Sequence, residues 1–377
     1  MSKKVILGLS GGVDSAVAAY VLKEQGYDVE CCFMRNWDSA ANNDYLGNPN
    51  NDADQCPQEK DYYDACAVAE ALGLKMHRID FVNEYWDNVF QTFIDEYKKG
   101  RTPNPDILCN KYIKFDHFLK YALSLGADYV ATGHYARVVH NEDGTSVMLR
   151  GVDSNKDQTY FLCQLNQYQL SKTLFPIGDI EKSEVRRIAN ELELIIANKK
   201  DSTGICFIGE RNFREFLKNY IPMKEGSIIE YETGRVLGTH QGVMYYTIGQ
   251  RKGLGIGGPG GPWFVIGKDV EKNELYVASG SEDNWLMTTS CLVSDVNYIG
   301  EKFEGELKCT AKFRYRQKDH GVTLKWVDDT NVLVTYDAPV AAVTPGQACV
   351  FYLDEVCLGG GTIEEVYKDG NKLPYLK

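Results

Sequence analysis

The stretch Leu9-Ser10-Gly11-Gly12-Val13-Asp14-Ser15 constrains the fold of this chain more than any other part of the sequence. It follows the apolar run Val5-Ile6-Leu7 and precedes an apolar helical pattern, so it predicts a strand, a glycine turn and a helix N-terminus. Glycine lets the backbone approach an anion closely, serine adds a hydroxyl donor, and the first N–H groups of a helix have no partner inside it. We therefore expect a βα unit whose turn binds phosphate.

The loop does not contain the Lys-Ser or Lys-Thr pair of a Walker loop. It instead resembles the Ser-Gly-Gly-x-Asp-Ser loop of the ATP pyrophosphatases. That resemblance implies that the loop holds the terminal pyrophosphate of ATP while a substrate oxygen attacks the α-phosphorus, which gives an adenylated intermediate. The alternative is a glycine-rich βα turn without a ligand, and the strand and helix on either side favour the first interpretation.

The length and composition point to a globular protein of several domains. A chain of 377 residues exceeds one typical core, and fractions of 44% hydrophobic and 25% charged residues are ordinary. The sequence has neither an apolar run of about 18 residues nor a signal-peptide pattern, which predicts a cytoplasmic protein with no membrane partner. Eleven cysteines, two of them adjacent at Cys31 and Cys32, suit reduced thiols. Because no Cys-x-x-Cys motif occurs, no zinc site is expected.

The pattern of apolar residues changes near residue 208. Up to that point strands and helices alternate, which predicts an α/β domain with a mainly parallel sheet over residues 1–208. Beyond it, short alternating runs such as Tyr245–Ile248 and Ala348–Leu353 are separated by Gly, Asp and Asn turns. The polar stretch Ser279–Asn284 reads as a linker. We therefore expect a small central β-rich domain over residues 209–283 and a C-terminal β-barrel over residues 284–377.

A second informative stretch runs from Thr102 to Asn110. Two prolines stiffen it, Asp106 stands where a helix N-cap belongs, and Cys109 falls about three residues into the following helix. The positive end of a helix favours a thiolate over a thiol, so Cys109 is expected to be reactive. The alternative is a buried, inert cysteine.

Another accessible thiol is expected at Cys206, in the polar segment that follows Lys199-Lys200. It stands 97 positions after Cys109, so only the fold could bring the two together. His134 follows a predicted strand, at the carboxyl edge where α/β sheets bind ligands, although a structural histidine is a close alternative. Met34 ends another strand and either packs against an adenine or belongs to the core.

The net charge of −12 argues against binding nucleic acid by bulk electrostatics. It leaves room for a local basic track. Such a track could include several short clusters, each of which could also be an ordinary solvated surface: Lys156, Lys199-Lys200, Arg211 with Arg214 and Lys218, Arg251-Lys252 and Lys312 to Lys318.

Six motifs together resemble those of the bacterial tRNA-specific 2-thiouridylase family, in the same order and across essentially the whole chain. They are the glycine loop, Asn104–Asn110, Ala131–Tyr135, Asp153–Gln158, Asp201–Phe207 and Tyr246–Leu254. The resemblance implies an N-terminal domain like the adenine nucleotide α-hydrolases. It also implies a sulfurtransferase that converts the wobble uridine of certain tRNAs to 2-thiouridine, through an adenylated base and a cysteine persulfide.

The same resemblance assigns roles to residues of this chain. Cys206 would carry the persulfide and Cys109 would act as the nucleophile, forming a disulfide with Cys206 in some or all cycles. Asn104, Pro105 and Asp106 would contact the flipped target base. ATP would be bound by Gly8, Leu9, Ser10, Gly11, Gly12, Val13, Asp14, Ser15, Met34 and Gly133. Contacts to tRNA would come from His134, Lys156, Asp157, Gln158, Arg314, Tyr315 and Gln347.

The cofactors and partners implied are ATP with Mg²⁺, tRNA, and a persulfide donor that is either a sulfur-relay protein or a cysteine desulfurase. Three alternatives remain open. One is an ATP pyrophosphatase that acts on a small molecule, such as an amide-forming synthetase. Another is a non-catalytic, nucleotide-gated RNA-binding module. In the third, the function is kept but Asp106, Cys109 and Cys206 ligate an iron–sulfur cluster.

Overall fold

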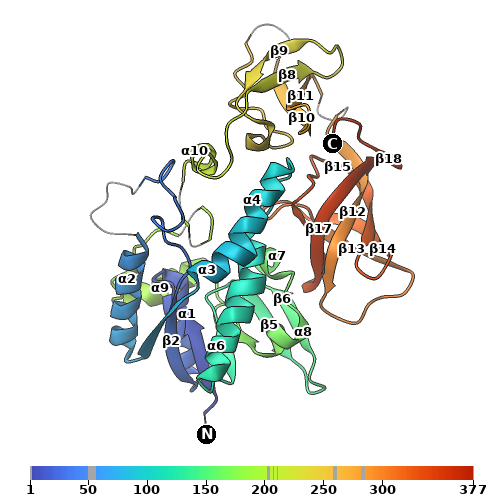
Figure 1. Cartoon of the computed structure of the whole chain (residues 1–377). Coiled ribbons are helices and arrows are strands. Elements are labelled where there is room, and N and C mark those ends of the chain that lie inside the picture. The colour runs from blue at the N-terminus through green and yellow to red at the C-terminus, as the bar shows by residue number, and fades with distance from the viewer. Residues whose placement is uncertain are drawn as a thin grey trace.

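The computed structural model describes residues 2–49, 57–201, 204–206, 208–209, 211–257, 261–281 and 285–376. Three parts are distinct in Figure 1: an N-terminal α/β part, a small β part coloured yellow, and a C-terminal barrel coloured orange to red. The α/β, central β-rich and barrel architecture predicted from the sequence is confirmed. The predicted boundary at residues 283 and 284 lies outside the described residues. In the described part of the chain, no helix is long and apolar enough to cross a membrane.

The N-terminal sheet has five parallel strands in the order β3-β2-β1-β4-β7. Its central strand pairs with β2 on one side and β4 on the other, so the strand order reverses there and a ligand crevice is expected at its carboxyl end. The glycine loop leaves the sheet at that point. The strands are β1 (Lys4–Gly8), β2 (Asp28–Arg35), β3 (Lys75–Asp80), β4 (Tyr129–Ala131) and β7 (Thr173–Leu174).

Helices cover both faces of this sheet because its buried strands are apolar on both sides. Along β1, Val5 and Leu7 pack into one core and Ile6 into the other. The first core is covered by α1 (Val13–Glu24), α2 (Pro57–Leu72) and α9 (Lys182–Glu191). The second is covered by two long helices with π-helical middles: α3 (Val82–Tyr85), η1 (Trp86–Phe90) and α4 (Gln91–Lys98), then α5 (Pro105–Leu108), η2 (Cys109–His117) and α6 (Phe118–Ser124).

Residues 141–145 join β5 (Ala136–His140) and β6 (Ser146–Arg150) in an antiparallel hairpin. Two short helices, α7 (Thr159–Leu162) and α8 (Gln167–Ser171), complete this part of the chain.

The central part is a four-stranded sheet in the order β10-β11-β8-β9. The prediction of a strand over Tyr245–Ile248 is wrong: a turn of 3₁₀ helix, η3 (Val243–Tyr245), replaces its start. The Tyr246 N–H bonds back to Val243 and the Thr247 N–H bonds the Gln250 side chain, so neither reaches a neighbouring strand. The other elements are α10 (Phe213–Leu217), β8 (Gly226–Glu230), β9 (Val236–His240), β10 (Trp263–Asp269) and β11 (Glu274–Ser279).

The C-terminal barrel closes because β12 pairs with both β15 and β17, which completes the ring β12-β15-β14-β13-β16-β17. The β5–β6 hairpin of the N-terminal part joins this sheet through the pair Val356 and Leu149. The strands are β12 (Met287–Tyr298), β13 (Glu306–Lys312), β14 (His320–Trp326), β15 (Val332–Ala341), β16 (Ala348–Leu353), β17 (Val356–Lys368) and β18 (Asn371–Lys372).

The segment after α4 contacts both other parts. Arg101 forms an ion pair of 2.6 Å with Glu364 of the barrel, and the Gly100 carbonyl accepts a hydrogen bond of 2.9 Å from Lys268 of the central sheet. Burial lowers the pKa of Lys268 to about 7. The three parts therefore meet at the C-terminal end of one long helix.

Candidate active site

The glycine loop adopts the predicted strand–turn–helix geometry at the carboxyl end of β1. The extended Gly12 precedes the first residue of α1, and Gly11 has a φ of +75°. A Cβ on Gly11 would lie 2.3 Å from the Asp61 carbonyl oxygen, so only glycine fits. The Ser15 hydroxyl accepts the Ser10 N–H at 3.2 Å and lies 3.1 Å from the Ser10 hydroxyl.

Gly133 and Met34, which are expected to bind ATP but lie outside the glycine loop in sequence, contact that loop. A Cβ on Gly133 would be 2.7 Å from the Ser15 nitrogen, so the turn after β4 touches the start of α1. Met34 is buried, and its Cε would be 3.0 Å from a Cβ on Gly8. Both predicted residues therefore border the turn, although Met34 is also part of the core.

Side chains that the sequence analysis did not assign to this place surround the glycine loop. The Asp14 carboxylate accepts hydrogen bonds from the Tyr135 hydroxyl at 2.7 Å and from Lys182 at 2.6 Å. Lys182 also forms an ion pair of 2.7 Å with Asp201. Lys199 lies on the other side and donates to the Gly11 carbonyl at 2.9 Å. Lys182 stands 168 positions from Asp14, and no local signal in the sequence links them.

The fold brings the two predicted reactive thiols together. The Cys109 and Cys206 sulfurs are 3.6 Å apart, and both thiols are free. The prediction that Asp106 caps the helix is wrong, since the Asn104 side chain caps α5 by accepting the Asp106 N–H at 3.1 Å. The Asp106 carboxylate instead accepts the Cys206 N–H at 3.0 Å. The Tyr85 hydroxyl donates to the Cys206 carbonyl at 2.8 Å, so two side chains hold the backbone of this residue.

The two thiols differ in acidity, and Cys109, which its place near a helix start was expected to make reactive, is the less acidic of the two. Burial raises the pKa of Cys109 well above its usual value, and the neighbouring Cys206 raises it further. The hydrogen bond from Cys109 lowers the pKa of Cys206. Burial raises this pKa, and the Lys114 ammonium offsets part of that rise. The helix N-terminus does not make Cys109 the more acidic thiol because the side chain is buried. Cys206 is the thiol that ionises first.

Lys114 is a residue of this site that the sequence analysis missed. It lies in the π-helical segment η2, five residues after Cys109. Each hydrogen bond of a π-helix spans one residue more than in an α-helix, which brings residues five apart toward one side. Burial lowers the pKa of Lys114, but the two cysteines and Asp106 raise it by a larger amount. The cations expected beside Cys206, Lys199-Lys200, are not the ones that act on it: Lys199 pairs with Asp61 and Asp64.

The segment expected to contact tRNA from the N-terminal part is partly turned inward. The Asp157 carboxylate is buried and accepts the Gly151 N–H and the Thr159 hydroxyl. The Gln158 side chain accepts the Tyr135 N–H at 2.9 Å. Lys156 is more exposed and pairs with Asp201 at 2.8 Å. Asp157 and Gln158 therefore shape this segment, while Lys156 is on its surface.

His134 is also buried. Its Nδ1 lies 2.7 Å from the Thr132 hydroxyl, and its ring packs near Phe115 and Phe175. Burial lowers its pKa well below the usual value, so the ring is neutral. This arrangement matches the structural alternative that the sequence analysis left open.

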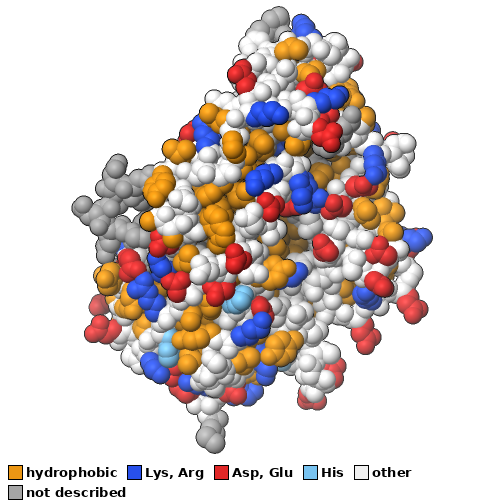
Figure 2. All heavy atoms as spheres, viewed as in Figure 1, with side chains coloured by type: hydrophobic (Ala, Val, Ile, Leu, Met, Phe, Trp, Pro, Cys, Tyr) orange, Lys and Arg blue, Asp and Glu red, His pale blue; other side chains and the backbone are white. Residues whose placement is uncertain are grey.

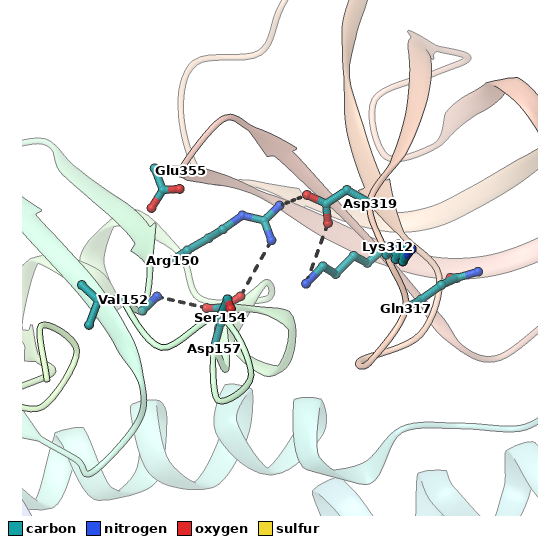
Figure 3. A pocket seen from close by; sticks show the side chains of 10 residues that line it. Arg150, Val152, Ser154, Asp157, Lys312, Gln317, Asp319 and Glu355 are labelled. Atoms are coloured by element: carbon teal, nitrogen blue, oxygen red, sulfur yellow. Dashed lines mark hydrogen bonds and ion pairs between the residues drawn. The ribbon is translucent and has the colours of Figure 1, made fainter. Parts of the chain in front are cut away.

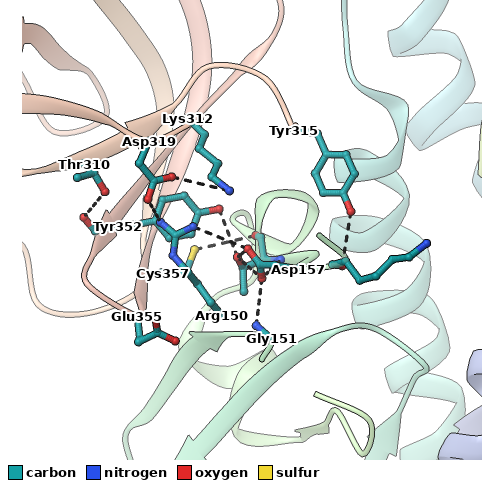
Figure 4. A network of polar contacts seen from close by, with 12 residues as sticks. Arg150, Gly151, Asp157, Thr310, Lys312, Tyr315, Asp319, Tyr352, Glu355 and Cys357 are labelled. Carbon is teal, nitrogen blue, oxygen red and sulfur yellow. Dashed lines mark hydrogen bonds and ion pairs between the residues drawn. The ribbon is translucent and has the colours of Figure 1, made fainter. Parts of the chain in front are cut away.

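The expected barrel contacts lie where the barrel faces the N-terminal part. The Arg314 guanidinium donates to the Ala342 carbonyl at 2.9 Å and the Thr344 hydroxyl at 3.1 Å. The Tyr315 ring packs 4.3 Å from that of Phe161, and its hydroxyl reaches the Lys156 carbonyl. Figure 4 shows Tyr315 pointing from the barrel toward the N-terminal part. Gln347 donates to the Thr102 carbonyl at 2.6 Å. Tyr315 and Gln347 of the barrel therefore contact the N-terminal part directly, and these residues lie near its boundary with the barrel.

A charged pocket of about 230 Å³ lies beside this region, between the loop after β6 and the hairpin after β13. Figure 3 shows Arg150 reaching from β6 to Asp319, which Lys312 also approaches. The Arg150 guanidinium also stacks on the Tyr352 ring at 3.7 Å. These contacts fix the barrel to the N-terminal part.

Positive and negative side chains are interspersed over the face seen in Figure 2. Among the described residues, no group of three or more His, Cys, Asp or Glu side chains is placed to hold a metal ion. The Asp106 carboxylate faces a backbone amide, so these positions lend no support to a cluster held by Asp106 and the two cysteines.

Three family models match successive parts of the chain. They are described as a tRNA methyl transferase HUP domain over residues 3–210, a tRNA methyl transferase PRC-barrel domain over 214–279 and an aminomethyltransferase beta-barrel domain over 288–363. The similarity to a solved structure is weaker. A 4-thiouridine synthetase in an RNA complex with bound ATP has a TM-score of 0.33 and 14% identity, over 58% of this chain and 50% of that chain.

Curated relatives match over nearly the full length. The tRNA-specific 2-thiouridylase MnmA of Mycoplasma capricolum is 59% identical over 98% of this chain and all of that protein. The protein of the same name from Mesoplasma florum is 60% identical over 97% of this chain and all of the relative, and that from Staphylococcus saprophyticus is 55% identical over 99% and 98%. On this similarity the chain belongs to the tRNA-specific 2-thiouridylase family.

Proposed function

We propose that this protein uses ATP to replace the C2 oxygen of the wobble uridine of tRNA with sulfur, giving 2-thiouridine. The observation that carries the proposal is the pair of free thiols 3.6 Å apart, of which one has a lowered and the other a raised pKa. A sulfur transfer that passes through a persulfide needs two thiols within reach of each other. The family to which the chain belongs and the glycine loop support the same assignment.

The first half of the reaction would take place at the glycine loop. The C2 oxygen of uracil is a poor leaving group, so it attacks the α-phosphorus of ATP and expels pyrophosphate, leaving an adenylated base. Residues Gly8 to Ser15, with Met34 and Gly133, would bind the nucleotide through backbone N–H groups and serine hydroxyls. Mg²⁺ would neutralise charge on the phosphates, and the Asp14 carboxylate is the loop residue suited to it.

The second half would use the thiol pair. A donor protein, either a sulfur-relay protein or a cysteine desulfurase, would pass a sulfur atom to Cys206, whose lowered pKa favours the nucleophilic thiolate. The terminal sulfur attacks C2 directly, or is released first as hydrogen sulfide. Either way C2 loses AMP, which carries the original oxygen away. Attack of Cys109 on the inner sulfur breaks the S–S bond and leaves a Cys109–Cys206 disulfide. An external dithiol, or two molecules of a monothiol, then supplies two electrons and two protons and is itself oxidised to a disulfide.

The substrate would lie across the region described above. Asn104, Pro105 and Asp106 stand within five residues before Cys109, which supports a role beside the flipped base. Lys156, Arg314, Tyr315 and Gln347 would contact tRNA. His134, Asp157 and Gln158, turned inward, would support the shape of this surface. The division of the chain into 1–208, 209–283 and 284–377 is part of the same proposal.

The test is to incubate the purified protein with unmodified tRNA, ATP, Mg²⁺ and a persulfide donor and to analyse the tRNA nucleosides by mass spectrometry. We expect 2-thiouridine at the wobble position and pyrophosphate release that depends on tRNA. Asp14→Ala or Ser15→Ala should abolish both while tRNA binding is retained. If the wild-type protein releases pyrophosphate with a small acceptor but not with tRNA, the proposal is wrong.

A further inference from the structure

The glycine loop carries no cation of its own, although the polyphosphate of ATP is strongly negative. The one charged residue between Leu9 and Ser15 is Asp14, which is itself negative. In a Walker loop, a lysine inside the motif reaches the β- and γ-phosphates. A nucleotide bound here would therefore take compensating charge from side chains that are distant in the sequence.

Two lysines reach the loop, and their contacts differ. Lys199 donates to the Gly11 carbonyl at 2.9 Å, to Asp61 at 2.7 Å and to Asp64 at 2.6 Å. An ammonium group has three N–H donors, and these contacts use all three. The two carboxylates also balance its charge. Lys199 therefore ties α2 to the loop and has little capacity for a ligand.

Lys182, the first residue of α9, is placed differently. Its ammonium lies 2.6 Å from the Asp14 carboxylate and 2.7 Å from that of Asp201, which uses two of its three donors among the contacts seen in the described residues. The side chain is 12% exposed, and that of Asp14 is 32% exposed. Solvent thus reaches the pair at the loop.

The contacts of Asp201 allow Lys182 to interact with a second anion. Asp201 also pairs with Lys156 at 2.8 Å and with Arg186 at 2.7 Å. Three cations therefore surround one carboxylate. If Lys182 turns toward a phosphate, Asp201 keeps Lys156 and Arg186 as cationic partners, and Asp14 keeps the hydrogen bond from the Tyr135 hydroxyl.

We propose that Lys182 binds the polyphosphate of ATP, in competition with its pair to Asp201. This inference rests on the proposed function and deepens it, because it names the cation that the loop lacks. The competing explanation is that Lys182 only anchors the segment that begins at Asp201 and leads to Cys206. The two explanations predict different effects on nucleotide affinity.

The first experiment measures equilibrium binding of ATP and of AMP, at fixed Mg²⁺, to the full-length protein and to Lys182→Gln. A charged hydrogen bond to phosphate predicts ATP affinity weaker by about 10- to 100-fold and AMP affinity nearly unchanged. Lys182→Arg should recover part of the ATP affinity. Arg187→Gln is the matched control, since it removes a cation from the same helix that pairs outward with Glu184 and Glu191.

A second variant separates binding from anchoring. Asp201→Asn removes the carboxylate that shares Lys182, so ATP affinity should stay equal or become tighter. If Lys182 only anchors Asp201, the two variants should weaken ATP binding alike. Equal losses of ATP and AMP affinity in Lys182→Gln, or no loss of either, would also overturn the inference. Failure of the wild-type protein to bind ATP at all would overturn the proposed function itself.

Discussion

At the scale of single residues, the two cysteines of the site are not equivalent. Cys206 has the lower pKa and a backbone fixed by Asp106 and Tyr85, whereas Cys109 is buried in a helix. We expect Cys206→Ser to hold no transferable sulfur and to make no 2-thiouridine. Cys109→Ser should still be loaded with a persulfide but turn over poorly. Peptide mass spectrometry after loading decides this, and a persulfide found on Cys109 alone would reverse the two roles.

The hydrogen bond from Cys109 and the Lys114 ammonium both lower the pKa of Cys206. The ammonium favours the thiolate, so Lys114→Gln should raise the pKa of Cys206. The alkylation rate of Cys206 by iodoacetamide should then rise at higher pH than in the wild type. Near pH 7 the variant should be alkylated several-fold more slowly than the wild type. The two rates should become equal at a pH above the pKa of Cys206 in both proteins.

Lys111→Gln is the control for this experiment. Lys111 lies three residues earlier in η2, and its ammonium donates to the Gln164 side chain. Coincident pH profiles for Lys114→Gln and the wild type would show that Lys114 does not act on the thiol.

At the scale of elements, a buried ion pair fixes the loop after β2. Asp44 and Arg211 lie 2.7 Å apart with side chains 0% and 5% exposed, and the Trp37 indole also donates to Asp44. The loop therefore packs against the segment that leads into α10. Asp44→Asn should lower the free energy of unfolding by about 3–5 kcal/mol, because it removes one charge of a buried pair.

Urea unfolding measures that change. Glu215→Gln is the matched control, since its pair with Lys218 is partly exposed and should contribute less than about 1 kcal/mol. Similar losses of unfolding free energy in the two variants would mean that the Asp44–Arg211 pair stabilises the protein no more than a partly exposed pair does.

At the scale of the whole molecule, an acidic protein has to bind an acidic polymer. If contact is confined to a track that includes Lys156, Arg314 and Arg316, few phosphates are neutralised. The affinity for tRNA should then fall with salt by a log–log slope of roughly 0.7 to 0.9 per phosphate contacted. Shape and the splayed anticodon loop would supply much of the selectivity.

Replacing Arg314 and Arg316 together by Ala should weaken tRNA binding and flatten that salt dependence, while ATP affinity is kept. The measurement is tRNA affinity against salt concentration for both proteins. Lys325→Ala is the control, because this exposed barrel lysine belongs to none of the predicted contacts. Slopes and affinities equal to the wild type would exclude these arginines from the RNA surface.

The amino-acid sequence by itself determined what depends on neighbouring residues. The apolar run before the glycine loop and the helical pattern after it were enough to predict β1, the turn and α1. The motifs that contain Cys109 and Cys206 identified the two thiols. These features could be predicted because turns and helix starts depend on the few neighbouring residues that form them.

Only the tertiary structure decided which of these features meet. The 3.6 Å between Cys109 and Cys206 depends on how segments 97 positions apart pack, and the π-helical winding that brings Lys114 to them left no recognised pattern in the sequence. Tyr246 and Ile248 are buried as a strand would require, yet the Tyr246 N–H bonds back to Val243 within a turn. Apolar spacing specifies burial, but the partners of a buried or charged group are specified by strand order and packing across the whole chain.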